Sequence, residues 1–86
     1  MSAVRFSDHA RLKLEILKTH GILLDRELIE DVVLRPQKLE QGYGGRKIAQ
    51  KGLGPDHVLR VVYEEYAEEL VIITFYPGRR ERYDKD

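Results

Sequence analysis

The C-terminal end of the chain combines arginines with a tyrosine directly after an apolar segment. Residues 70–76 are strongly apolar, and we expect this strand to break at Pro77-Gly78. The tail that follows, residues 79–83, carries Arg79, Arg80, Arg82 and Tyr83. Guanidinium groups bind phosphates through paired hydrogen bonds, and a phenol can stack on a base or transfer a proton. The tail is therefore a candidate RNA-binding or RNA-cleaving element, with an ordinary solvated terminus as the alternative.

Arg60 is a second candidate for phosphate binding. Strict alternation from His57 predicts a strand that places Val58, Arg60 and Val62 on one face. Arg60 would then be a charge within an apolar face. It could be a phosphate anchor on a rigid sheet, or a structural residue that reaches solvent or pairs with a carboxylate, since an unpaired buried arginine is very costly.

The segment from residue 42 to 47, Gly-Tyr-Gly-Gly-Arg-Lys, is a third basic site. It resembles a phosphate-binding loop only superficially, because a Walker motif ends in Gly-Lys-Ser/Thr and continues as a helix, whereas a strand is expected here. Tyr43, Arg46 and Lys47 are plausible nucleic-acid contacts. They would equally suit a hairpin that needs these residues for turn geometry and solubility.

His9 lies in the first turn of an expected helix. The positive end of the helix dipole disfavours an imidazolium there, so we expect a ring that can accept a proton, or else a structural histidine. His20 is three helical turns away, too far to share a metal ion with His9. The sequence contains no cysteine, and no set of His, Asp or Glu has a ligand spacing, so no metal site is predicted.

Composition favours a small cytoplasmic domain. The 86 residues are expected to form one domain, residues 1–86, with little room for an internal cofactor. No charged leader opens the chain, and no apolar stretch approaches the ~20 residues that span a bilayer, so no membrane association is expected. The net charge is zero. Residues 35–51 nevertheless hold five basic side chains against Glu40 alone, so a basic face remains possible.

The first half of the chain has helical periodicity. Residues 3–6 are expected to form a short strand, and a helix capped by Ser7 should run to about Thr19 and stop at Gly21. Its buried stripe is expected to be wide, comprising Ala10, Leu12, Leu14, Ile16 and Leu17. A second helix should begin after an Asp25 cap and end at Arg35-Pro36, burying Leu28, Ile29, Val32 and Val33.

After Pro36 the periodicity changes to two, which indicates strands. Two hairpins are expected: residues 38–43 with 46–51 around Gly44-Gly45, and residues 57–64 with 70–76 around an acidic turn. The predicted fold class is α+β, with a two-helix hairpin packed on one face of a mainly antiparallel sheet of four strands, or five with residues 3–6. We also expect the Arg46/Lys47 turn, Arg60 and the tail to converge on one exposed basic surface.

Several segments together resemble a protein family. They are Phe6-Ser7-Asp8-His9-Ala10-Arg11, Gly21-Ile22, Arg35-Pro36, Gly42-Tyr43-Gly44-Gly45-Arg46-Lys47-Ile48-Ala49 and Leu59-Arg60-Val61-Val62-Tyr63. The pattern covers most of the chain and resembles the uncharacterised family called domain of unknown function forty-two fifty-eight. That family is similar to a distant branch of the RelE/ParE toxin superfamily. The resemblance implies a small α+β fold and either mRNA cleavage on the ribosome without a metal, as in RelE-type members, or poisoning of gyrase, as in ParE-type members.

The resemblance also implies site residues and partners. Arg60, Arg80, Arg82 and Tyr83 match RelE-type basic and C-terminal residues by kind and approximate place, and Glu40 is the candidate acidic base. In the implied endoribonuclease, Glu40, His9 or Tyr83 takes the proton of the ribose 2′-hydroxyl while Arg60 and Arg80 stabilise the phosphorane, without a cofactor. RNA or the ribosome would be the target and an antitoxin the protein partner. The alternative is a non-catalytic module that uses the same basic face to bind nucleic acid or protein.

Overall fold

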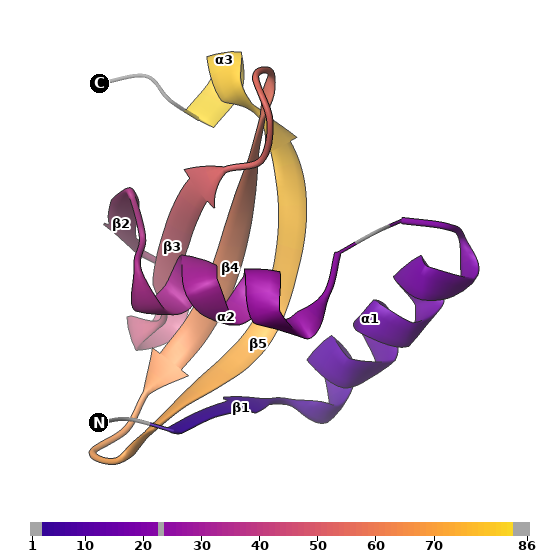
Figure 1. Cartoon of the computed structure of the whole chain (residues 1–86). Helices are drawn as coiled ribbons and strands as arrows, with labels where there is room; N and C mark the ends of the chain where they lie inside the picture. The colour runs from indigo at the N-terminus through magenta and orange to yellow at the C-terminus, as the bar shows by residue number, and fades with distance from the viewer. Residues whose placement is uncertain (1–2, 23, 84–86) are drawn as a thin grey trace.

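A five-stranded sheet forms the centre of the fold, with the strands in the order β1-β5-β4-β3-β2 (Figure 1). The structure, a computed structural model, describes residues 3–22 and 24–83. The strands are β1 (Ala3–Phe6), β2 (Lys38–Gln41), β3 (Lys47–Gly52), β4 (His57–Glu65) and β5 (Glu69–Arg79). β1 is parallel to β5, and the other neighbours are antiparallel. The expected α+β class and mainly antiparallel sheet are confirmed, with residues 3–6 as the fifth strand.

Two helices are capped by the residues that the sequence indicates. α1 (Asp8–Thr19) begins after Ser7, whose Oγ accepts a hydrogen bond from the Ala10 amide at 3.1 Å. α2 (Arg26–Leu34) begins after Asp25, whose Oδ1 accepts from the Leu28 amide at 2.8 Å. Each cap satisfies an amide that the first helical turn leaves without an intrahelical partner. A third, one-turn helix, α3 (Arg80–Tyr83), follows β5.

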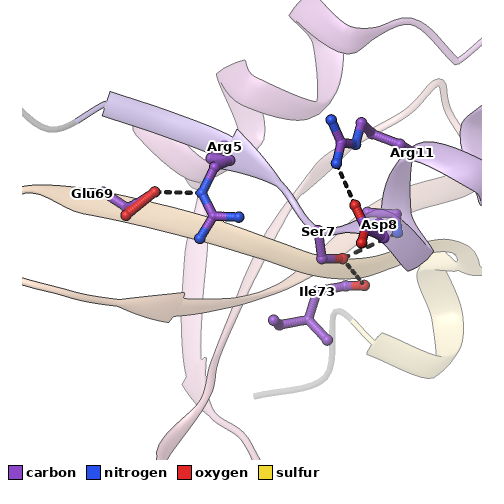
Figure 2. A network of polar contacts seen from close by, with 7 residues as sticks. Arg5, Ser7, Asp8, Arg11, Glu69 and Ile73 are labelled. Atoms are coloured by element: carbon purple, nitrogen blue, oxygen red, sulfur yellow. Dashed lines mark hydrogen bonds and ion pairs between the residues drawn. The ribbon is translucent and has the colours of Figure 1, made fainter.

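The junction between β1 and α1 is attached to β5 by polar contacts (Figure 2). The Ser7 hydroxyl donates to the Ile73 carbonyl at 3.1 Å, and Arg5 Nε lies 2.5 Å from Glu69 Oε1. Ser7 leaves the sheet where the β1–β5 ladder ends, because β1 pairs only with Glu69–Ile72. The second half of β5 is therefore an edge of the sheet.

Both long helices cover one face of the sheet and share one core with it. Ala10 and Leu14 of α1 and Ile29 of α2 pack into the same cluster as Val61 and Phe75 of the sheet. α1 packs mainly on β5, and α2 packs on β4 and β3. Because each helix has the sheet as its main partner, the expected packing of the two helices as a hairpin is not confirmed.

The buried stripe of α1 is narrower than expected. Leu12 is 60% exposed and Ile16 is 48% exposed. The helix lies over the β1–β5 end of the sheet (Figure 1), so only one side of it meets other parts of the protein. The expectation that Leu12 and Ile16 are buried is therefore wrong.

β5 is longer than the sequence suggested. It continues through Pro77 and Gly78 to Arg79, and these residues pair with Leu59, Val58 and His57 of β4. The expected break at Pro77-Gly78 is wrong because this part of β5 is an edge, where a proline removes no ladder bond on the outer side. The tail thus begins inside the sheet and only then turns into α3.

The β2–β3 connection forms as a tight turn. A short 3-10 turn at Tyr43–Gly45 joins the strands, and Gly44 and Gly45 have φ values of 69° and 82°. Positive φ at both glycines is what the sequence predicts for this turn. β2 itself ends at Gln41, two residues earlier than expected.

Candidate functional site

A row of polar side chains crosses the face of the sheet that α1 and α2 leave uncovered. The strand register places Lys38, Gln50, Arg60 and Tyr76 opposite one another on β2, β3, β4 and β5. Opposed residues of antiparallel strands project to the same face. The neighbouring Val61 lies in the core on the other face. We call these four residues the Arg60 row.

Arg60 is the centre of a dense hydrogen-bond network. Its Nη1 donates to Glu40 Oε2 at 2.7 Å and to Gln50 Oε1 at 2.5 Å, and its Nε donates to the Tyr76 hydroxyl at 3.1 Å. The residue is only 6% exposed. Burial lowers the pKa of Arg60, but the hydrogen bonds to Tyr76 and Glu40, together with electrostatic attraction to both groups, outweigh burial and raise it above its ordinary value. The guanidinium is therefore permanently charged and held in one orientation.

The C-terminal helix α3 folds back over this network. The Tyr83 ring centroid lies 4.3 Å from Arg60 Cζ, within cation–π distance. The Tyr83 carbonyl accepts hydrogen bonds from Lys38 Nζ at 3.0 Å and from Gln50 Nε2 at 3.3 Å. A Cβ on Gly78 would overlap the Tyr83 ring. Gly78 thus provides the space in which the ring covers Arg60.

An open pocket of about 370 Å³ lies beside Tyr83. Its lining residues come from the start of β4, the end of β5 and α3: His57, Pro77, Gly78, Arg79, Arg82 and Tyr83. Among the described arginines, only Arg79 and Arg82 have side chains that make neither a hydrogen bond nor an ion pair within the described part of the chain. Arg82 Cζ lies 5.7 Å from the centroid of the Tyr83 ring. Two guanidinium groups at this pocket are thus able to bind an external anion.

Arg80 was expected to stabilise the phosphorane beside Arg60, but its guanidinium binds backbone carbonyls of the β3–β4 loop instead. Its Nε and Nη2 donate to the carbonyls of Pro55 and Gly54, each at 3.2 Å, and its amide donates to the Asp56 carbonyl. Gly52 leaves room for this guanidinium, because a Cβ there would lie 2.6 Å from Arg80 Nη2. Arg80 therefore attaches α3 to the β3–β4 loop.

His9 lies away from the Arg60 row. It is exposed in the first turn of α1, and α1 packs on the opposite face of the sheet. A general-base role for His9 at Arg60 is excluded by this placement.

The basic turn before β3 does not join the Arg60 row either. Arg46 pairs with Glu64 at 3.5 Å, and Lys47 pairs with Glu65. Lys47 also projects to the helix-bearing face, because Gln50, three residues on, projects to the other. Tyr43 is 98% exposed. The expected convergence of three basic segments is confirmed only for the tail, which meets Arg60, whereas Arg46 and Lys47 of the turn pair with the acidic end of β4.

Sequence reasoning missed Lys38, Gln50 and Tyr76. A β-bulge explains Tyr76: Val62 pairs with Thr74 but Tyr63 pairs with Ile72, which leaves Ile73 as an extra residue. Strict alternation would have placed Tyr76 on the same face as Ile72, in the core. Lys38 and Gln50 require the β2–β3 register, which the sequence specifies only loosely.

No protein-family model, curated protein or solved structure matches this chain. Within residues 3–22 and 24–83, no helix is long and apolar enough to cross a membrane. Among the same residues, no group of three or more His, Asp or Glu side chains is placed to hold a metal ion.

Proposed function

We propose that this protein is a RelE/ParE-like toxin domain that binds RNA on the helix-free face of its sheet and cleaves it there. The observation that carries the proposal is the meeting of Glu40, Arg60 and Tyr83, which come from β2, β4 and α3. A carboxylate that can accept a proton, a fixed cation and a phenol that can donate a proton are together able to support metal-independent RNA cleavage.

The reaction would be an attack of the ribose 2′-oxygen on the adjacent phosphate. Glu40, whose side chain is 37% exposed, accepts the 2′-hydroxyl proton. Arg60 and Lys38 stabilise the negative charge of the phosphorane, and the Tyr83 phenol gives its proton to the departing 5′-oxygen. The products are a 2′,3′-cyclic phosphate and a 5′-hydroxyl end, so no cofactor is consumed. Arg80 and His9 have no role in this scheme because of their placement.

The RNA backbone would continue into the pocket beside Tyr83, where Arg79 and Arg82 contact phosphates. Such contacts position the RNA without reading its sequence, and they weaken as salt rises. An antitoxin that covers the same face and a cytoplasmic location belong to this proposal.

The direct test is expression in a sensitive host, with growth followed and new RNA ends mapped. Glu40→Gln should keep the hydrogen bond from Arg60 yet lower cleavage by roughly 10²- to 10⁴-fold, because an amide cannot act as a base. Glu64→Gln is the matched control, since Glu64 lies on β4 and pairs with Arg46. If wild-type protein neither arrests growth nor produces new RNA ends, the proposed nuclease activity is rejected.

The burial of Arg60 favours a second candidate, a non-catalytic RNA-binding module. An arginine at 6% exposure with Glu40, Gln50 and Tyr76 as partners is well suited to hold the sheet and α3 together. In that case Arg79 and Arg82 alone contact RNA. The Arg79→Gln/Arg82→Gln double variant should then abolish salt-dependent binding, while wild-type protein leaves RNA intact.

A further inference from the structure

The pocket beside Tyr83 lies at the end of the sheet where β4 begins, β5 ends and α3 follows (Figure 1). His57 is directly opposite Arg79 in the β4–β5 register, so the imidazole and the guanidinium start from neighbouring positions on one face of the sheet. Arg82 lines the same pocket from α3. Three nitrogen-bearing side chains from three elements therefore line one pocket.

This pocket carries two positive charges that no acidic side chain of the described residues neutralises. Arg79 and Arg82 have side chains without a hydrogen bond or an ion pair in the described part of the chain. Among the described residues that line the pocket, none carries a carboxylate. Both arginines are exposed, so a ligand can reach them without displacing a protein group. An anion with more than one charge would neutralise both of them.

The number of oxygens distinguishes a terminal phosphate from a phosphate within a nucleic-acid backbone. A guanidinium presents a fork of N–H donors that binds two oxygens at once, so two guanidinium groups can engage more than two oxygens. A phosphomonoester has three terminal oxygens and a charge of about −1.5 to −2 at pH 7. A backbone phosphodiester has two such oxygens and a single charge. The two arginines therefore match a phosphomonoester better than a diester.

The rest of the pocket is suited to a nucleoside. The Tyr83 ring, Pro77 and Gly78 complete its lining, and an aromatic ring can stack on a base. The volume of about 370 Å³ falls within the range of ~300 to 1,000 Å³ that is typical of small-molecule sites. Arg60 is not among the lining residues, so a ligand in this pocket leaves the contact between Arg60 and Tyr83 in place.

We propose that this pocket binds the phosphomonoester group of a nucleotide. Arg79 and Arg82 hold the phosphate, His57 donates a further hydrogen bond, and the nucleoside lies against the Tyr83 ring. The assignment of this nucleotide to the phosphorylated end of an RNA strand rests on the proposed function, in which RNA continues into the pocket. The existence of the site does not, because a free mononucleotide has the same chemistry.

The first measurement is an NMR titration of the full-length protein with adenosine 5′-monophosphate and with adenosine 3′,5′-cyclic monophosphate. The two ligands share a nucleoside, but the first carries a phosphomonoester and the second a diester. The monoester should bind on the order of tenfold more tightly, because the diester loses at least one hydrogen bond between charged groups. Chemical-shift changes are expected at residues 57, 77–79, 82 and 83. Equal affinities, or changes confined to Lys38 and Gln50, would overturn the proposal.

Three double variants separate a specific site from the effect of net charge. Arg79→Gln/Arg82→Gln should remove the preference for the monoester. Arg79→Lys/Arg82→Lys keeps the charge but should lose most of the preference, because an ammonium lacks the paired donors of a guanidinium. Arg11→Gln/Lys18→Gln removes two exposed charges of α1 and should leave the preference unchanged. Full preference in the lysine variant, or its loss in the α1 control, would show that net charge alone attracts the nucleotide and would overturn the site.

The source of the nucleotide is identified with one short RNA that carries a phosphate at its 5′ end, at its 3′ end or at neither end. A gain on the order of tenfold from a terminal phosphate would assign the site to RNA ends, and a preference seen only between the two adenosine nucleotides would assign it to a free mononucleotide. Preference for the monoester without RNA cleavage would support the site and reject the nuclease. RNA cleavage without this preference would do the reverse.

Discussion

The two faces of the sheet differ in the side chains that they bury, although the same strands supply both faces. On the helix-bearing face, Leu59 and Val61 of β4 join an apolar core in which both are fully buried. On the helix-free face, the residue between them, Arg60, is 6% exposed and surrounded by polar partners. Apolar burial stabilises a fold directly, whereas a buried ion pair often adds no net stability because of its desolvation cost. The comparison suggests that the first face maintains the fold and the second carries function.

The largest expected effect is on the helix-bearing face. Phe75 is fully buried, so Phe75→Ala should lower the free energy of unfolding by about 3 to 5 kcal/mol. Tyr76, its neighbour on the other face, is half-buried, and Tyr76→Ala should cost clearly less. Urea denaturation of both variants measures the difference. An equal or larger cost for Tyr76→Ala would contradict the assignment of stability to the helix-bearing face.

Removing the central charge should have an intermediate effect on stability. Arg60→Met removes the guanidinium that donates to Glu40 and to Gln50, and we expect a loss of about 1 to 3 kcal/mol in the free energy of unfolding. Adding Glu40→Leu should recover part of this loss, because the uncompensated carboxylate is then gone. The coupling free energy is read from a double-mutant cycle in urea. Additive effects of the two substitutions would show that the ion pair is not coupled.

A smaller effect is expected at Tyr83, where ring and hydroxyl can be separated. Tyr83→Ala should cost about 1 kcal/mol because it removes the ring from Arg60. Tyr83→Phe should keep full stability, since the hydroxyl makes no hydrogen bond within the described residues, yet lower RNA cleavage by roughly 10²- to 10⁴-fold. Unfolding curves test the predicted stabilities, and cleavage rates test the predicted role of the hydroxyl. A Tyr83→Phe variant that cleaves normally would remove the phenol from the mechanism.

The smallest effect concerns pH and the attachment of α2. Hydrogen bonds from Lys51 and Arg35 hold the pKa of Asp31 below its ordinary range. The stability that this provides is fully present above the unfolded pKa of about 3.9 and is lost as pH falls through the lower folded value. Asp31→Asn should therefore lower the melting temperature slightly at pH 7 and match wild type at very low pH. A constant difference at all pH values would contradict this origin.

The fold followed from local signals, because Ser7, Asp25, Gly44 and Gly45 each satisfy a local backbone requirement. The candidate site followed only in part. The alternation of β4 predicted that Arg60 lies on the face opposite Leu59 and Val61. Glu40 and Tyr83 were identified by residue type. Their meeting depends on strand register and on the fold-back of α3, neither of which is local.

Tyr83 shows most clearly what the sequence could not indicate. Gly78, on the preceding strand, leaves space for the Tyr83 ring over Arg60, and this contact between two elements has no signal in the local sequence. The bulge at Ile73 likewise moved Tyr76 to the Arg60 face. Both depend on packing between elements, which periodicity does not encode.

The central claim is that RNA binds to the helix-free face. It is tested most directly by an NMR titration of the wild-type protein with single-stranded RNA at two salt concentrations. We predict chemical-shift changes at Lys38, Gln50, Arg60 and residues 79–83, with affinity that falls steeply as salt rises. Changes confined to α1 and α2, or the absence of salt-dependent binding, would contradict the claim.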